Sequence, residues 1–199
     1  MKYTIIEDCS PFYIRFECDG IAEVIDKSLK YVKDMQFTDG FQPYRYSLDQ
    51  VADIMLSVPM RQELKLNYSR VMMFVTQPGY YYRAHKDGMN HRYSINYTAK
   101  ILDGECKTSW YADEDLSGYA IDNLPTKVSR ECDGFDKSKH TPIKSMVALP
   151  GECILFNTEI FHDFDNSTSK NERMVLTLRD ADPGEVYFED VRQRLFGIH

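Results

Sequence analysis

Three side chains of the types that bind metal ions stand out in this sequence. His85 and Asp87 lie two residues apart in His85-Lys86-Asp87, and His162 follows an apolar segment that ends at Phe156. Residues i and i+2 of a strand point to the same face, so one strand end can offer an imidazole and a carboxylate to one ion. If His162 joins them from another strand, two histidines and a carboxylate hold one face of the ion and leave other positions open. That arrangement suits Fe(II), which can take up O2 and a chelating co-substrate there.

A His-x-Asp pattern alone is a weak signal, because the chain has five histidines and 31 acidic residues and such a pair can be an ordinary surface feature. Arg173 adds to it, since it follows His162 along the chain and opens an apolar segment. A guanidinium that points into a core needs an anionic partner. The far carboxylate of 2-oxoglutarate would satisfy it, and so would an acidic side chain. Arg179 shares the strand face of Arg173 and is the alternative anchor.

Short apolar or alternating segments separated by Gly and Pro turns predict an antiparallel sandwich or barrel. Two segments with apolar residues at helical spacing, 21–37 and 47–60, predict helices, with Ser47 as an N-cap of the second. We therefore expect a mainly β protein with flanking helices, built on a double-stranded β-helix, the cupin-like jelly-roll barrel. The expected strands are Pro11–Cys18, Val71–Val75, Tyr80–His85, Tyr93–Leu102, Ser145–Leu149, Glu152–Phe156 and Arg173–Arg179.

The length of 199 residues fits a single domain. We expect residues 1–68 to supply a strand and helices on the barrel, 69–180 the catalytic core, and 181–199 a C-terminal tail or helix. The polar segment 107–141 is expected to be a long loop, either a lid over the substrate or a static cover. Its Trp110, the only tryptophan, would contact substrate in the first case; with Tyr111 it would form a small core in the second.

Composition sets limits on partners and location. The net charge is −7 and no basic run exceeds two residues, which argues against a nucleic-acid partner on electrostatic grounds. No apolar run is long enough for a membrane span, and the first residues lack a signal peptide's apolar core. The five cysteines are dispersed, as expected for free thiols in a reducing compartment. These features predict a cytoplasmic protein, and they leave its oligomeric state open.

Three segments resemble the Fe(II)/2-oxoglutarate-dependent dioxygenases, and among them the aspartyl/asparaginyl β-hydroxylase branch. The order is a His-x-Asp pair, a distal histidine after a Pro-Gly turn and an apolar strand, and then an arginine. The resemblance covers roughly residues 70–180. It is carried by Gln77-Pro78-Gly79 through His85, by Asn90 through Tyr97, and by Pro150-Gly151 through Asp163 followed by Glu172 through Leu176.

The resemblance implies an oxygenase that hydroxylates its substrate with Fe(II), 2-oxoglutarate and O2. His85, Asp87 and His162 would bind iron, and Arg173 would bind the far carboxylate of 2-oxoglutarate. The chain departs from the branch at two places. Vertebrate-type members lack the carboxylate ligand that Asp87 supplies here, and Asn96 stands where the family often has a histidine near the co-substrate. Strand parity places Ser94, Asn96 and Thr98 on one face, which we expect to line the pocket.

The substrate and two other functional classes stay open at this point. Candidate substrates are an amino-acid side chain in a protein or a small metabolite, and Arg83 and Arg92 could pair with a substrate carboxylate. Arg83 shares strand parity with His85, which predicts that it faces the pocket. A non-catalytic cupin-like metal-binding protein, or a Zn- or Mn-dependent hydrolase or isomerase, could use the same barrel and triad. Neither alternative needs Arg173 near the metal.

Overall fold

The computed structural model describes residues 3–20, 44–47, 69–87, 92–100, 106–119, 129–180 and 186–198. Within these ranges, the side chains of 44–47, 69–72, 100, 129–131 and 179–180 are not described. The helices expected over 21–37 and 48–60 therefore lie outside the described residues. Ser47, expected as an N-cap, is the last residue of a strand.

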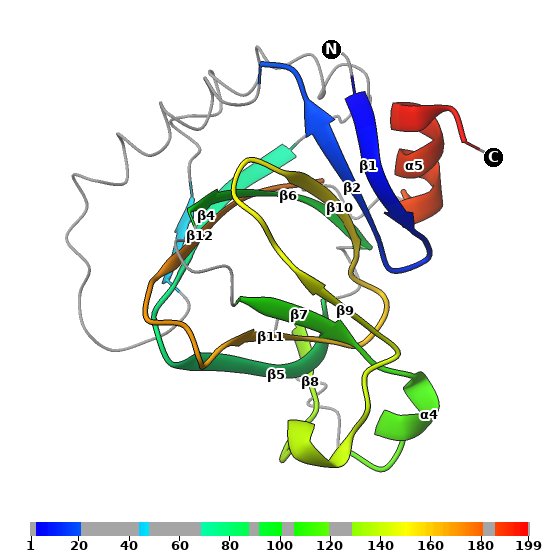
Figure 1. Ribbon diagram of the computed structural model, residues 1–199. Coiled ribbons are helices and arrows are strands. Elements are labelled where there is room, and N and C mark those ends of the chain that lie inside the picture. The colour runs from blue at the N-terminus through cyan, green and yellow to red at the C-terminus, as the bar shows by residue number, and fades with distance from the viewer. Residues whose placement is uncertain are drawn as a thin grey trace.

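Two antiparallel sheets face each other, as Figure 1 shows, and together they confirm the expected jelly-roll fold. Cross-strand pairs along each sheet join segments that are distant in sequence, so the barrel depends on long-range register. The larger sheet has the strand order β1 (Tyr3–Cys9), β2 (Tyr13–Cys18), β10 (Cys153–Asn157), β6 (Tyr93–Lys100), β12 (Arg173–Asp180), β4 (Ser69–Thr76), β3 (Tyr44–Ser47). The smaller sheet has the order β8 (Ser129–Glu131), β5 (Tyr80–Asp87), β11 (His162–Asn166), β7 (Lys107–Trp110), β9 (Lys144–Val147).

The largest hydrophobic core lies on the outer face of the larger sheet. Alternation sends Tyr93, Ile95 and Tyr97 of β6 into this core, whereas Ser94 and Asn96 line a cavity between the sheets. The same period divides the other strands of this sheet. The face of β6 that borders the cavity is thereby polar, as expected from the parity of this strand.

The C-terminal segment contains a helix, α5 (Phe188–Phe196), which covers this core. Phe188, Val191 and Leu195 are its buried residues. Phe196 makes an edge contact with Phe16 of β2, with ring centroids 5.2 Å apart. Gly197 ends the helix with φ 66°, a left-handed conformation that favours glycine.

None of the helices in the described part of the chain is long and apolar enough to cross a membrane.

The segment 107–141 is not the irregular loop that its polarity predicts. It contributes β7 and β8 to the smaller sheet and contains α4 (Asp113–Leu116) and the 3-10 turn η2 (Lys137–Lys139). A second hydrophobic cluster packs α4 and the residues that flank these elements on the outer face of the smaller sheet, and among its members are Tyr111, Leu116 and Phe135. The described parts of the segment are therefore folded elements that cover this sheet. Low apolar periodicity hid them, because β7 is short and α4 has one turn.

Leu116 tests this arrangement, since its side chain is 1% exposed within the cover. Replacing it with alanine should lower the free energy of unfolding by about 2–5 kcal/mol, because a cavity replaces buried contacts. Ile143→Ala, at a position 55% exposed, is the matched control and should change it by less than about 0.5 kcal/mol. Urea-induced equilibrium unfolding measures both. Equal effects for the two variants would mean that the cover does not pack as described.

Candidate metal centre

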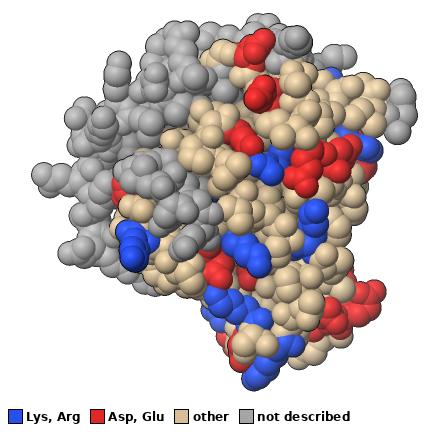
Figure 2. All heavy atoms as spheres, viewed as in Figure 1, with Lys and Arg blue, Asp and Glu red and all other residues tan. Residues whose placement is uncertain are grey.

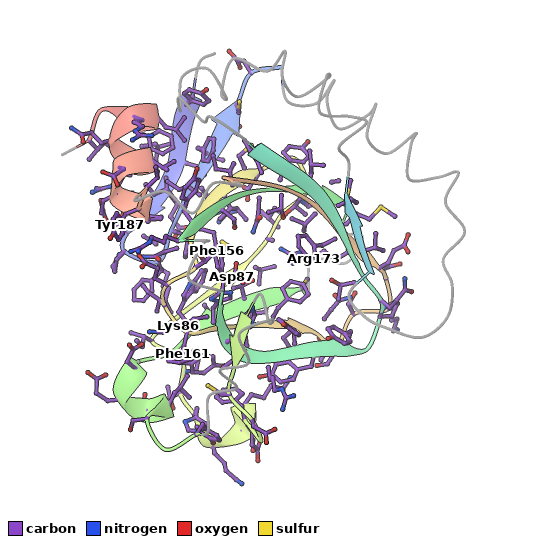
Figure 3. All side chains as sticks on the ribbon, turned by 180° about the vertical axis from the view of Figure 1, so that it is seen from behind. Lys86, Asp87, Phe156, Phe161, Arg173 and Tyr187 are labelled. Carbon is purple, nitrogen blue, oxygen red and sulfur yellow. The ribbon has the colours of Figure 1, made fainter. Side chains whose placement is uncertain are left out.

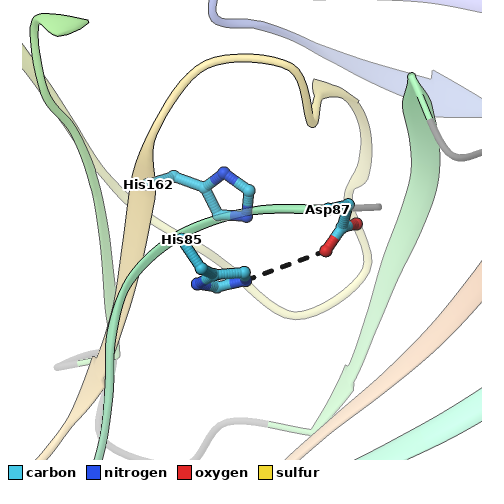
Figure 4. A group of neighbouring side chains, drawn as sticks. All are labelled: His85, Asp87 and His162. Atoms are coloured by element: carbon cyan, nitrogen blue, oxygen red, sulfur yellow. Dashed lines mark ion pairs between the residues drawn. The ribbon is translucent and has the colours of Figure 1, made fainter. Parts of the chain in front are cut away.

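Cross-strand pairing brings the two histidines together. His85 of β5 is the register partner of His162 of β11, and their ring centroids are 4.3 Å apart. Asp87 ends β5, and its Oδ1 lies 3.8 Å from Nε2 of His85 (Figure 4). One ligand atom from each of the three residues lies within 4.8 Å of the others. Small rotations of these side chains would therefore bring all three onto one ion.

A bulge in β5 decides which of its side chains face inward. Phe164 pairs with Tyr82 and His162 with His85, so β5 has one residue more than β11 between these pairs. Both Tyr82 and His85 consequently line the cavity, while Ala84 packs in the outer cluster. Strand parity predicted that Arg83 faces the pocket, and this is wrong. Its side chain is 41% exposed, and Nη1 of its guanidinium lies 2.9 Å from Oδ1 of Asp133.

Hydrogen bonds to the backbone set the state of both imidazoles. Nδ1 of His85 lies 2.9 Å from the carbonyl oxygen of Arg83, and Nδ1 of His162 lies 2.8 Å from that of Ile160. A carbonyl only accepts, so each Nδ1 carries a proton, and in the neutral imidazole this leaves the Nε2 lone pair for a metal ion. Two such nitrogens and one carboxylate oxygen form the donor set that suits Fe(II). The residues present thus fit a bound iron ion.

The triad opens into a cavity of about 280 Å³ between the sheets. Figure 3 shows Asp87, Phe156 and Arg173 between the two sheets. Phe74, Phe156 and Phe164 supply apolar walls. Polar groups also reach the cavity: Thr76, Ser94, Asn96, Thr108 and Thr177. Such a mixture of apolar walls and few polar groups is typical of a small-molecule site.

Arg173 is the cation of this cavity. It is 8% exposed, and its guanidinium lies over the ring of Phe164 at 4.1 Å. Within the described part of the chain it forms no ion pair with a carboxylate, and its Nε has no hydrogen-bond partner. Burial lowers its pKa below the ordinary value. A buried guanidinium without a carboxylate partner would be stabilised by an anion that enters the cavity.

Asn96 lies in the same cavity and is held by two hydroxyl groups. Its Oδ1 accepts from Thr177 at 2.8 Å and from Ser94 at 3.3 Å. The side-chain nitrogen is then left to donate. Arg173, Val175 and Thr177 of β12 all line the cavity, as their spacing predicted. Arg179 lies on the same strand, and its side chain is outside the described residues.

Two further residues with expected substrate roles lie elsewhere. Arg92 pairs with Glu159 at 3.3 Å and stacks over Tyr187 at 4.1 Å, and it does not line the cavity. Trp110 is completely buried in β7, so it offers no surface to a substrate from a lid. On the face seen in Figure 2, basic and acidic side chains of the described residues are mixed. Arg83, Arg92 and Trp110, the three residues expected to contact substrate, are therefore all outside the lining of the cavity.

Asp163 is a residue that sequence reasoning did not single out. It is 2% exposed and accepts hydrogen bonds from Tyr111 at 2.7 Å, Tyr81 at 3.0 Å and the backbone N–H of Ser109 at 3.1 Å. Burial raises its pKa despite these bonds. Through these contacts Asp163 joins β11 to β5 and β7 and so holds the neighbouring His162 in place. The one sequence signal was its position beside that histidine.

No protein-family model and no curated protein sequence matches this chain. Solved structures do match in fold. One is EvdO2 from Micromonospora carbonacea var. aurantiaca, crystallised with 2-oxoglutarate, with a TM-score of 0.55, 15% identity, and 88% of this chain and 91% of that one covered.

Two proteins associated with nogalamycin are also similar. The carbocyclase SnoK, described as non-heme and α-ketoglutarate-dependent, has a TM-score of 0.52 and 12% identity over 87% of this chain and 83% of its own. The epimerase SnoN, solved with Fe3+, α-ketoglutarate and a nogalamycin compound, has a TM-score of 0.50 and 9% identity, covering 85% and 79%. At these identities the comparisons establish a shared fold.

Proposed function

We propose that this protein is an Fe(II)- and 2-oxoglutarate-dependent oxygenase that hydroxylates an amino-acid side chain of a protein or a small metabolite. In this proposal His85, Asp87 and His162 bind the iron, and Arg173 binds the far carboxylate of 2-oxoglutarate. Asn96 donates a hydrogen bond to the co-substrate. Structural neighbours that bind 2-oxoglutarate and iron support the proposal, and the sequence resemblance points to the same chemistry.

The observation that carries the proposal is the position of Arg173. A buried cation without a carboxylate partner among the described residues costs several kcal/mol. It lies in the same cavity as three converging metal ligands. A dicarboxylate that chelates the metal at one end and meets the guanidinium at the other would satisfy both groups. Neither a hydrolase nor an isomerase with this triad requires such a cation.

The chain's own residues would contribute binding, orientation and exclusion of water. Arg173 holds one end of the co-substrate, which sets the direction in which its keto acid approaches the triad. Phe74, Phe156 and Phe164 keep water from the space between them. Bound iron supplies the activation of O2, coupled to decarboxylation of 2-oxoglutarate to succinate. The imidazole N–H groups stay hydrogen-bonded to backbone carbonyls, so the ligand orientation is set before the metal binds.

Succinate formation tests the function directly. The protein should convert 2-oxoglutarate to succinate with Fe(II) and O2, and the rate should rise with a true substrate from among peptides, amino acids and small metabolites. Zn(II) or Mn(II) in place of Fe(II) should give no succinate. Metal-dependent hydrolysis or isomerisation without consumption of 2-oxoglutarate would instead support a Zn- or Mn-dependent hydrolase or isomerase. Binding of metal without any turnover would support the non-catalytic alternative.

The metal ligands can be tested without turnover. Purified protein should bind one Fe(II) per chain in an anaerobic titration, and His85→Ala, Asp87→Ala or His162→Ala should each abolish or strongly weaken binding. His140→Ala is the matched control, because His140 contacts Tyr119 and Phe135 outside the cavity. If a variant that combines all three alanine substitutions still binds one equivalent of Fe(II), the ligand assignment is wrong.

Arg173→Ala should raise the 2-oxoglutarate requirement while leaving iron affinity nearly intact. Loss of a buried charge-assisted pair costs about 2–5 kcal/mol, which corresponds to a tens- to thousands-fold weaker affinity. Arg173→Lys should recover it in part, since an ammonium lacks the bidentate geometry. Arg83→Ala is the control and should leave the requirement unchanged, because Arg83 faces away from the cavity. An unchanged requirement in Arg173→Ala would transfer the role to Arg179.

A further inference from the structure

Four rings pack in series starting from His162 of the metal triad, two from each sheet. Trp110 is the cross-strand partner of His162 in the smaller sheet, and Tyr13 is the cross-strand partner of Phe156 in the larger one. Ring centroids are 4.7 Å apart for His162 and Phe156 and 5.1 Å apart for Phe156 and Trp110. Trp110 and Tyr13 are stacked at 5.1 Å with 21° between their planes. Each ring in this series therefore contacts the next.

The series ends near the surface at a thiol. Cys9 of β1 is the cross-strand partner of Tyr13, and its Sγ donates to Oε1 of Glu7 at 3.1 Å. Cys9 is partly exposed, whereas the other four cysteines are buried. Lys144 lies over the ring of Tyr13 and 3.8 Å from Glu7. An unbroken path thus runs from a candidate metal ligand to the thiol of a partly exposed cysteine and its neighbouring carboxylate.

We propose that Trp110, Tyr13 and Cys9 form an electron relay, which supplies an electron to a one-electron oxidant generated at the metal when no substrate is within reach. The inference rests on the proposed function, because such an oxidant arises from O2 activation. Tryptophan, tyrosine and cysteine are among the side chains that lose an electron most readily. The relay would divert damage from the metal ligands to a residue that soluble thiols can repair.

Each step transfers one electron. Trp110 loses an electron to the oxidant. Tyr13 then reduces the oxidised Trp110, and Glu7 accepts the phenolic proton that Tyr13 loses in this step. Cys9 then reduces the Tyr13 radical, which recovers a proton from Glu7, while the thiol proton of Cys9 passes to Glu7 and on to solvent. A low-molecular-weight thiol returns a hydrogen atom to the Cys9 radical. The net change is one electron gained at the metal and one soluble thiol oxidised.

The charges around Tyr13 suit proton-coupled oxidation. Burial, followed by the interactions with Cys9 and Glu7, raises the pKa of Tyr13, so the phenol is protonated at rest. The hydrogen bond from Cys9 lowers the pKa of Glu7, which keeps that carboxylate ionised. An ionised acceptor next to a protonated phenol lets the proton leave together with the electron.

Photo-oxidation of the metal-free protein tests the path independently of iron. Trp110 is the only tryptophan, so selective photoionisation creates one tryptophan radical, which transient absorption should show converting to a tyrosyl radical. Tyr13→Phe keeps the stacked ring and should lengthen the lifetime of the Trp110 radical several-fold. Cys9→Ser should instead prolong the tyrosyl radical. Tyr119→Phe, far from this path, is the control. Identical decay of the Trp110 radical in wild type and Tyr13→Phe would overturn the relay.

The loaded protein supplies the second test. With Fe(II), 2-oxoglutarate and O2, without substrate, a nitrone spin trap should label Cys9, as detected by peptide mass spectrometry. Trp110→Phe and Tyr13→Phe, checked for native folding by circular dichroism, should lose the label, while Cys132→Ser should retain it. Succinate formation with equal labelling in wild type and Trp110→Phe would overturn the relay. Absence of succinate would contradict the proposed function, and the photochemical result would still decide whether Trp110 oxidises Tyr13.

Discussion

The pairing of His85 with His162 across β5 and β11 is the contact on which the candidate site depends. A slip of one residue in this register would turn each affected side chain to the other face of the sheet and separate the two imidazoles. The bulge in β5 lets Tyr82 and His85 both face inward despite their odd spacing. Asp163, next to His162 in β11, secures the same register through bonds to three neighbouring groups. Structure and site are therefore stabilised by the same strands.

The distribution of apolar side chains explains how the barrel keeps a polar interior. The main core packs on the outer face of the larger sheet under α5, and a second cluster covers the outer face of the smaller sheet. The space between the sheets is then free to hold hydroxyl groups, an amide and the buried cation of Arg173. The two outer clusters contribute apolar burial, which offsets the energetic cost of the buried cation until an anion binds. Preorganisation of this kind is common at binding sites.

A third hydrophobic cluster, around Trp110, lies inside the barrel. Tyr13, Phe156 and Trp110 fill the barrel next to His162. Through Tyr13, the cluster also connects the candidate metal site to β2 and, by strand pairing, to β1. Tight packing explains why Trp110 is fully buried, although it stands in a polar stretch of sequence. The same contacts that stabilise this end of the barrel make the proposed electron path continuous.

The sequence by itself determined which residue types the candidate site combines and the faces of its regular strands. The types and order of His85, Asp87, His162 and Arg173 indicated the metal centre, and the period of two placed Ser94 and Asn96, as well as Val175 and Thr177, towards the cavity. These features are local, because residue type and strand period are read from neighbouring positions. The same reasoning placed Arg83 in the pocket and missed β7 and the role of Asp163. Tertiary structure decided these, since a bulge, an edge pairing and a buried hydrogen-bond network each arise only when strands distant in sequence meet.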